Sequence, residues 1–295
     1  MQTLYSIENL DNEVKKPDPV KIIQKQFDQT KDLFLFLVHT ITDIAQYVET
    51  NARNRASKHL PTVEDLSVNT KLAGNLQLWK ILENQSYLPA LKASKVDLLA
   101  DQQIIKKLFQ DLVNTPEYQQ YISVQSRDKK SEIEILDFIF DNIMLPNELY
   151  IGILEENFSN WDDDNTMVTQ LVSNFIAKPK GTNLSQFVSA EKKIFATELL
   201  QTAISREQQA MELIKPKLKN WDPERIALLD MLLMRLGVCE FLYFETIPPK
   251  VTINEYIDIA KEYSTQQSGQ FINGILDNIH KDLVNQNKMH KINFK

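Results

Sequence analysis

The sequence predicts an all-α fold, and three observations lead to this class. Apolar residues recur at spacings of three and four along most of the chain, which is the period of an amphipathic helix. No run of strict apolar–polar alternation is long enough to suggest a sheet. Glycine occurs only 6 times in 295 residues, which disfavours the tight turns of all-β folds and a glycine-rich phosphate loop.

A long helix is predicted after Pro17 and Pro19, because apolar residues line one helical face as far as Val48. We expect it to end at residues 59–62, where Pro61 disfavours the helical conformation of the residue before it. A polar connection is expected over residues 63–75.

Shorter helices are predicted over residues 104–112 and 133–140, again from apolar spacing. Residues 178–184 contain a proline and a glycine, so they are the best candidate for a domain boundary or a long loop. Residues 190–218 are interpreted as one long helix that Pro216 strains.

The last helices carry clearer signals. Asp222-Pro223 is a predicted helix start, because Asp caps free amides and Pro fits the first turn. The helix that follows is apolar on nearly every side as far as Leu242, which predicts a central, buried element. Residues 252–255 are interpreted as a capping box. A final helix is expected from about Ser268, and Gly274 within it indicates close approach of another helix.

Charge and cysteine content limit the classes of function. The formal net charge is −7, so nucleic-acid binding would need a local patch or a basic partner. Cys239 is the single cysteine, and no signal peptide is evident, which together indicate the cytoplasm. No stretch approaches the roughly 20 apolar residues that span a bilayer, so no membrane role is expected.

The sequence contains no catalytic constellation, so we expect a protein that is not an enzyme and needs no cofactor or metal. Its four histidines, His39, His59, His280 and His290, are scattered, and neither a Walker nor a GxSxG pattern occurs. Residues 162–164 are three aspartates that would suit a hard cation, but they equally fit a helix start, which is the favoured interpretation. Cys239 is expected to be a small core residue.

Several charged and polar groups allow two interpretations each. Asp230, Arg235 and Glu240 interrupt the apolar helix, and they indicate either internal salt bridges or a protein interface. Lysines at 215, 217 and 219, and at 288, 291 and 295, are typical of solvated faces. The polar patch of residues 264–270 fits a phosphate site at a helix start, but capping explains it equally well.

Three segments together resemble the NusB family. They are residues 220–230, NWDPERIALLD; residues 249–261, PKVTINEYIDIAK; and residues 268–277, SGQFINGILD. Their order and spacing resemble the family signature over roughly residues 190–285. Residues 1–6, MQTLYS, are similar to the first helix of the family.

The resemblance implies a NusB-like helical bundle preceded by a large helical insertion or extension. Residues 186–295 would form the RNA- and protein-binding core. Residues 1–185 would form a helical N-terminal region, with the first NusB-type helix at 1–10 and an insertion over 15–185 whose role the sequence leaves open. The arginine-rich arm that usually precedes the first helix is expected to be absent, which would weaken electrostatic RNA binding.

The resemblance also implies partners and site residues. NusB pairs with the small ribosomal subunit protein NusE, and the pair holds single-stranded boxA RNA within an RNA polymerase antitermination complex. By correspondence of position, the residues expected to face NusE are Tyr5, Glu224 and Asp230. Those expected near RNA are Lys217, Gln267, Ser268, Gln270 and Phe271. An aromatic ring can stack on an unpaired base, and amides can bond base edges.

Two other functions remain as alternatives. The chain would be a protein scaffold if it contacted NusE or polymerase without touching RNA, which its acidic balance favours. NusB-like helices also precede the catalytic domain of ribosomal-RNA cytosine methyltransferases, but no Rossmann-type domain is expected before the last residue, Lys295.

Overall fold

The computed structural model describes residues 1–9, 18–99, 101–218 and 226–292, and every regular element within them is helical. The all-α class is therefore confirmed. The chain forms two compact units. We call residues 1–25 and 188–295 the terminal unit and residues 26–187 the central unit; the break at 25/26 falls within one long helix, α2 (Pro19–Ala56).

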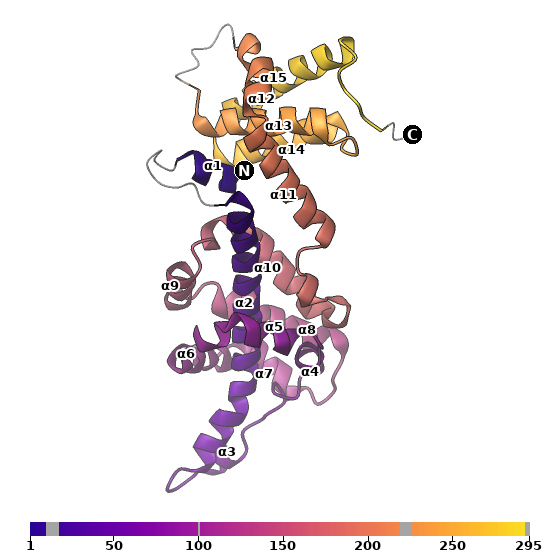
Figure 1. Ribbon diagram of the computed structural model, residues 1–295. Helices are drawn as coiled ribbons and strands as arrows, with labels where there is room; N and C mark the ends of the chain where they lie inside the picture. The colour runs from indigo at the N-terminus through magenta and orange to yellow at the C-terminus, as the bar shows by residue number, and fades with distance from the viewer. Residues whose placement is uncertain (10–17, 100, 219–225, 293–295) are drawn as a thin grey trace. The chain divides into compact units, whose positions relative to one another are not determined.

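The terminal unit brings together helices from both ends of the chain (Figure 1). Its elements after α2 in the chain are α11 (Ala190–Ser205), α12 (Glu207–Ile214), η5 (Lys215–Lys217), α13 (Leu228–Tyr243), α14 (Pro249–Tyr263) and α15 (Gln266–Asn285), and α1 (Gln2–Glu8) joins them. Helix α13 packs against α1, α11, α12, α14 and α15. Its residues 232–241 are all buried, so the predicted central helix is confirmed.

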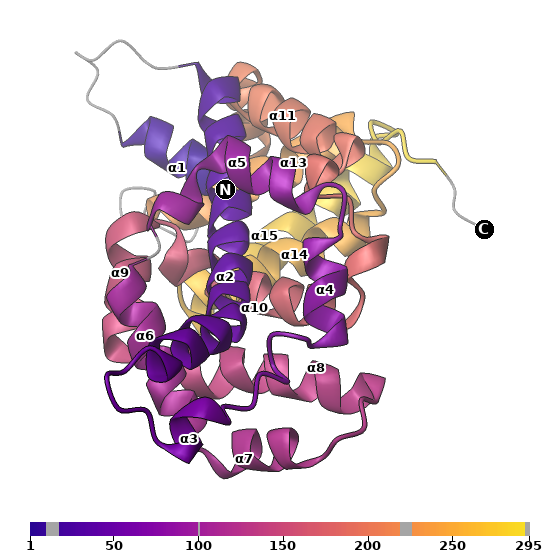
Figure 2. The same cartoon turned by 90° about the horizontal axis from the view of Figure 1, so that it is seen from below.

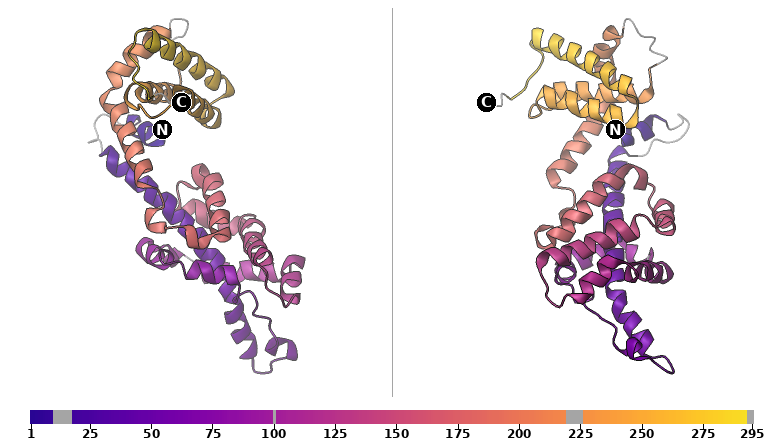
Figure 3. Two further views of the ribbon diagram at one scale, coloured as in Figure 1. Left: turned by 90° about the vertical axis from the view of Figure 1, so that its right-hand side faces the viewer. Right: turned by 180° about the vertical axis from the view of Figure 1, so that it is seen from behind.

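The central unit is organised along α2, whose apolar residues 33–38, 41, 44, 45 and 48 lie in its core. The other helices are α3 (Val63–Leu66), α4 (Leu76–Leu82), α5 (Tyr87–Ser94), η1 (Val96–Leu99), α6 (Gln102–Val113), α7 (Pro116–Ser123), α8 (Lys129–Phe138), η2 (Ile139–Met144, a π-helix), α9 (Glu148–Asn157), α10 (Trp161–Ala177), η3 (Pro179–Gly181) and η4 (Leu184–Gln186). Most of them gather along the middle of α2, whereas α3 lies at the C-terminal end of α2, as Figures 2 and 3 show. The predicted helices around residues 104–112 and 133–140 are confirmed.

The expected polar connection over residues 63–75 is wrong in its first part, because it contains α3. Thr62 caps this helix, and Thr62 and Asp65 satisfy each other's backbone amides in a capping box. Asp65 also accepts hydrogen bonds from Lys58 Nζ at 2.9 Å and Arg55 Nε at 2.8 Å. These two cations hold the pKa of the Asp65 carboxyl below its usual range.

Two other local expectations are wrong. Residues 190–218 do not form one helix, because Arg206 leaves the helical region with φ −110° and ψ 19° and separates α11 from α12. Residues 252–255 are not a capping box, because α14 already begins at Pro249. Thr252 is therefore inside the helix and fully buried. The predicted start at Asp222-Pro223 lies outside the described residues, and the helix is described from Leu228.

Close helix approach occurs at Gly237, and the expectation that Gly274 serves this purpose is wrong. A Cβ at Gly237 would lie 3.0 Å from both δ-methyls of Leu276 and 3.3 Å from Cδ2 of Tyr256. A Cβ at Gly274 would meet nothing within 4 Å. Glycine is therefore required sterically where α13 packs against α14 and α15, and no internal contact requires it at position 274.

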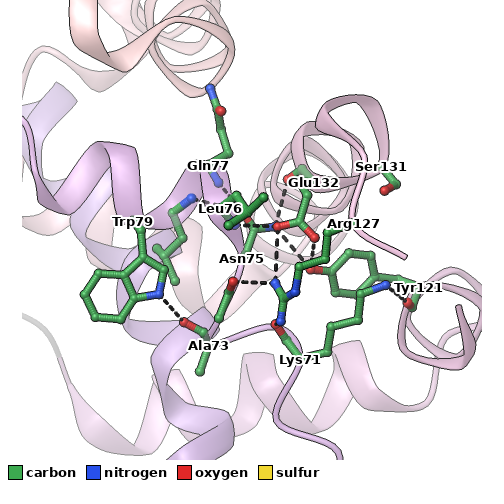
Figure 4. A network of polar contacts seen from close by, with 12 residues as sticks. Lys71, Ala73, Asn75, Leu76, Gln77, Trp79, Tyr121, Arg127, Ser131 and Glu132 are labelled. Atoms are coloured by element: carbon green, nitrogen blue, oxygen red, sulfur yellow. Dashed lines mark hydrogen bonds and ion pairs between the residues drawn. The ribbon is translucent and has the colours of Figure 1, made fainter. Parts of the chain in front are cut away.

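A buried carboxylate, Glu132, joins α4, α7 and α8 in the central unit (Figure 4). It is 1% exposed and accepts hydrogen bonds from the Leu76 amide and from the Tyr121 hydroxyl, the latter at 2.9 Å. Asn75 Nδ2 donates to the backbone oxygen of Glu132 at 2.9 Å, and Arg127 Nη1 lies 3.5 Å from its carboxylate. Burial and the Glu132 charge raise the pKa of Tyr121. The buried charge is thus fully partnered.

Candidate functional site

The first turns of α15 place most of the RNA-site residues predicted by resemblance on one element. Gln267 and Gln270 are exposed, and Phe271 is partly buried against the core of the terminal unit. Residues 267, 270, 271 and 274 share one side of a helix, because they are separated by three and four positions. The buried residues Ile272, Leu276 and Ile279 occupy the opposite side. We call residues 267, 270, 271, 274 and 278 the amide face of α15.

Ser268 has a different environment from its neighbours. It is 8% exposed, and its hydroxyl lies 2.9 Å from that of Ser264 and 3.0 Å from that of Thr265. The Thr265 hydroxyl accepts a hydrogen bond from the Ser268 amide at 3.1 Å, which is the usual geometry of a helix cap. Thr265 therefore caps α15 through the Ser268 amide, and the Ser268 hydroxyl is held by the hydroxyls of Ser264 and Thr265.

Lys217 lies in η5 and is ion-paired with Asp282 of α15. Its side chain is 23% exposed, so the ammonium group is partly shielded by the protein. Lysines along α15 and α14 are also paired, Lys281 with Asp277 at 2.6 Å and Lys261 with Asp258 at 2.9 Å. Lys217, Lys281 and Lys261 thus each have a carboxylate partner.

The residues predicted to face a protein partner differ in their exposure. Tyr5 lies on α1 and is 44% exposed. Asp230 lies in the first turn of α13 and is 6% exposed, and no described group donates to its Oδ1 atom. An unpaired buried carboxylate oxygen is costly, so this atom suits a donor supplied from outside the described residues. Glu224 lies outside the described residues.

The other charges of α13 have internal partners. Arg235 is 3% exposed, and its guanidinium lies 2.8 Å from Glu8 Oε1 and 3.1 Å from Glu207 Oε1. Glu240 accepts a hydrogen bond from the Tyr256 hydroxyl at 2.7 Å, and burial raises its pKa. The salt-bridge interpretation of the sequence therefore holds for Arg235. Glu240 is also satisfied internally, but by the neutral Tyr256 hydroxyl.

Lys291 was interpreted from the sequence as part of a solvated face, but it is bound to the end of α13. Its ammonium group donates to the backbone oxygen of Glu240 at 2.8 Å and to that of Phe244 at 2.7 Å. A cation there complements the negative end of the helix dipole. Burial lowers the pKa of Lys291. Sequence spacing alone could not reveal this, because the partners are backbone atoms about 50 residues earlier.

The three aspartates and the cysteine that were considered for metal binding or thiol chemistry each have a structural role. Residues 162–164 lie in the first turn of α10, as expected for a helix start, and the described residues hold no group of three metal-ligating side chains. Cys239 is 1% exposed, and burial raises the pKa of its thiol to about 12, so a core role is confirmed. Among the described helices, none is long and apolar enough to cross a membrane.

Comparison with known proteins finds similarity over the C-terminal part of the chain. The family model described as "NusB family" matches residues 157–281. The chain is 42% identical over 97 residues to the transcription antitermination protein NusB of Salinibacter ruber, which is 33% of this chain and 61% of that relative. It is 39% identical over 99 residues to that of Chloroherpeton thalassium, covering 34% of this chain and 47% of the relative.

A third relative is covered more completely. The chain is 41% identical over 97 residues to the transcription antitermination protein NusB of Desulfatibacillum aliphaticivorans, which is 33% of this chain and 68% of that relative. The chain therefore spans between about half and two thirds of the length of these relatives. No solved structure matches it.

Proposed function

The chain belongs to the NusB family, and from this membership we propose that it acts as a transcription antitermination factor. In this proposal it pairs with NusE, and the pair binds single-stranded boxA-type RNA from the leaders of ribosomal RNA operons. The complex would then join RNA polymerase and keep it from terminating.

One observation carries the RNA part of the proposal, which is the exposed amide face on the family-matched helix α15. Gln267 and Gln270 are exposed, and the Phe271 ring beside them on the helix is partly buried against the core. An amide donates and accepts at once, so it can bond the edge of an unpaired base. Lys217 would contribute to RNA binding only when its ion pair with Asp282 opens.

The protein part of the proposal rests on Tyr5 and Asp230. Tyr5 offers an exposed ring on α1, and Asp230 offers a buried carboxylate oxygen without a described donor. A basic protein such as a ribosomal subunit component can supply that donor with complementary charge. Glu224 and Ser268 remain part of the proposal through the family resemblance, the first as a NusE contact and the second as an RNA contact.

A second candidate is a protein scaffold that contacts NusE or polymerase without binding RNA. The observation in its favour is that Lys217 and Lys281 are held in ion pairs with Asp282 and Asp277 of α15. The net charge of −7 adds repulsion of phosphate. A scaffold of this kind would bind NusE, and the complex of the two proteins would show no affinity for RNA.

The test is binding of the full chain to boxA-type RNA, with and without NusE, at two salt concentrations. Tight binding that needs NusE and weakens as salt rises is expected, because phosphate contacts release counterions. Phe271→Ala should weaken RNA binding by about tenfold, the loss of one stacked base. Phe195→Ala is the matched control, because Phe195 is a partly buried ring that contacts Phe244 on another part of the unit.

NusE affinity is measured separately with Tyr5→Ala. The control is Tyr243→Ala, because Tyr243 is similarly exposed, at 38% against 44%, but lies on α13. Loss of NusE binding by the first variant alone supports the proposed interface. NusE binding without any RNA affinity in the wild-type complex would favour the scaffold and remove the RNA function.

A further inference from the structure

Gly274 occupies the middle of the amide face, and nothing inside the described structure requires a glycine there. It is exposed, and a Cβ at this position would meet no atom within 4 Å. Glycine inside a helix costs about 1 kcal/mol relative to alanine. Within the terminal unit, Gly237 and Gly269 differ from it, because a Cβ at either would lie within 3.3 Å of a side chain.

We propose that Gly274 leaves the backbone of α15 bare so that a single strand of RNA can lie directly against it. This inference rests on the proposed RNA-binding function and deepens it by naming the point of closest contact. The strand would cross the helix at Gly274, with Gln270 and Phe271 on one side and Asn278 on the other.

The helical register supports this path. Position 274 follows Gln267, Gln270 and Phe271 by seven, four and three residues, so all four lie on one side of α15. Asn278 is one turn further on, and its Nδ2 donates to the backbone oxygen of Gly274 at 3.3 Å. A methyl group at 274 would cover the backbone that the glycine leaves exposed, so a base or ribose could no longer contact that backbone directly.

The chemistry of the face favours RNA over an acidic or apolar protein surface. Its side chains are neutral amides and one aromatic ring, which match base edges and base planes. The nearest carboxylate along this side, Asp277, is paired with Lys281 at 2.6 Å. Phosphate repulsion at the crossing point is therefore reduced.

The chain supplies a matched control in Gly152 of α9. A Cβ at Gly152 also meets nothing within 4 Å, so alanine fits both sites equally well. Its neighbours on the same helical side include Glu148, Glu155 and Glu156, which are exposed carboxylates that repel phosphate. A substitution there changes helix propensity without touching an RNA-compatible face.

The experiment measures RNA affinity and unfolding for the wild type, Gly274→Ala, Gly274→Gln and Gly152→Ala, with NusE present. Both alanine variants should lower the unfolding equilibrium constant of their unit by about fivefold, from helix propensity alone. Gly274→Ala should weaken binding of single-stranded boxA-type RNA by about tenfold and Gly274→Gln by more, whereas Gly152→Ala should leave it unchanged.

Each outcome has one meaning. Undiminished RNA binding by Gly274→Ala and Gly274→Gln, with a wild type that binds well, would overturn the role of Gly274 and leave the proposed function standing. Weaker NusE binding by these variants, with RNA contacts intact, would overturn it in favour of a protein contact. A wild-type complex that binds no RNA would remove both proposals.

Discussion

The guanidinium of Arg235 in α13 lies 2.8 Å from the carboxylate of Glu8 in α1, which precedes it by 227 residues. Arg235 is 3% exposed, so this ion pair is the charged part of the contact between the first helix and the centre of the terminal unit. A second carboxylate, Glu207 of α12, lies 3.1 Å from the same guanidinium.

Removal of Glu8 should destabilise the terminal unit, because it leaves a buried guanidinium with one remaining partner. Glu8→Ala is expected to lower the free energy of unfolding by about 2 kcal/mol. Glu207→Ala should cost less, about 0.5 kcal/mol, because Glu207 is 55% exposed and water replaces it. Urea unfolding of both variants measures the difference. Equal losses would show that burial of the pair does not decide its contribution.

Glu132 should be essential to the central unit. Glu132→Ala leaves the Leu76 amide and the Tyr121 hydroxyl without their acceptor, so we expect a loss of about 3 kcal/mol in the free energy of unfolding. Glu134→Ala on the same helix is the control, since Glu134 is 61% exposed and its ion pair with Lys130, at 3.5 Å, is also exposed. The prediction fails if denaturant midpoints of the two variants coincide.

Asp137 should make the central unit less stable as pH rises. Burial, and then the charges of Asp141 and Glu134, raise its pKa to about 6 from the usual 3.8. The folded state then holds a proton that the unfolded state has lost between those pH values, so stability falls as pH rises through this window.

The variant Asp137→Asn removes this penalty. We expect it to be about 1 kcal/mol more stable than the wild type at pH 8, a value reduced for the partial exposure of the group, and to show no advantage near pH 4. Thermal unfolding at both pH values measures this, with Glu156→Gln, an exposed site, as the control. An advantage that persists unchanged at pH 4 would refute the titration of Asp137 as its cause.

Alanine at Gly237 should destabilise the terminal unit by about 2 kcal/mol, because its Cβ would press against the δ-methyls of Leu276 at 3.0 Å. Alanine at Gly269 should cost less, since its closest neighbour is Cγ of the flexible Lys261 side chain at 3.3 Å. Calorimetric melting of the two variants shows which substitution destabilises the unit more. The reverse order would contradict the packing between α13 and α15.

Release of Lys217 should strengthen RNA binding if the proposed function holds. Asp282→Asn removes the carboxylate that pairs with Lys217, so the ammonium group becomes available to phosphate. RNA affinity at low salt should rise by a few fold, and its salt dependence should steepen. Asp277→Asn frees Lys281, another lysine paired on α15, so its RNA affinity and salt dependence provide a comparison. If the salt dependence of RNA binding is unchanged in Asp282→Asn, Lys217 does not contact the RNA.

Local patterns predicted most of the helices but not the contacts between distant ones. Apolar spacing was enough to identify α13 as buried, because an all-round apolar helix has no other stable environment. The partners of Arg235 lie on segments far away in the chain, which no local pattern encodes.

The same limit applies to the candidate site. The resemblance placed Gln267, Gln270 and Phe271 together, and α15 carries them on one side. It could not reveal that Lys217 is paired with Asp282, because the two residues are far apart in the chain. The capping interpretation of residues 264–270, in contrast, needed only local spacing, and Thr265 caps α15. Gly274 was misinterpreted for a related reason, since spacing does not distinguish a crowded glycine from an open one.

The assembly of the terminal unit from both ends of the chain dictates an order of events during synthesis. Leu4 and Ile7 of α1 belong to the same core as Leu283 of α15, so this core cannot close until α15 has left the ribosome. The central unit has a separate core within residues 26–187 and is complete much earlier. The nascent chain therefore carries its first helix unpacked, with its apolar side chains open to chaperones, while the middle of the protein folds.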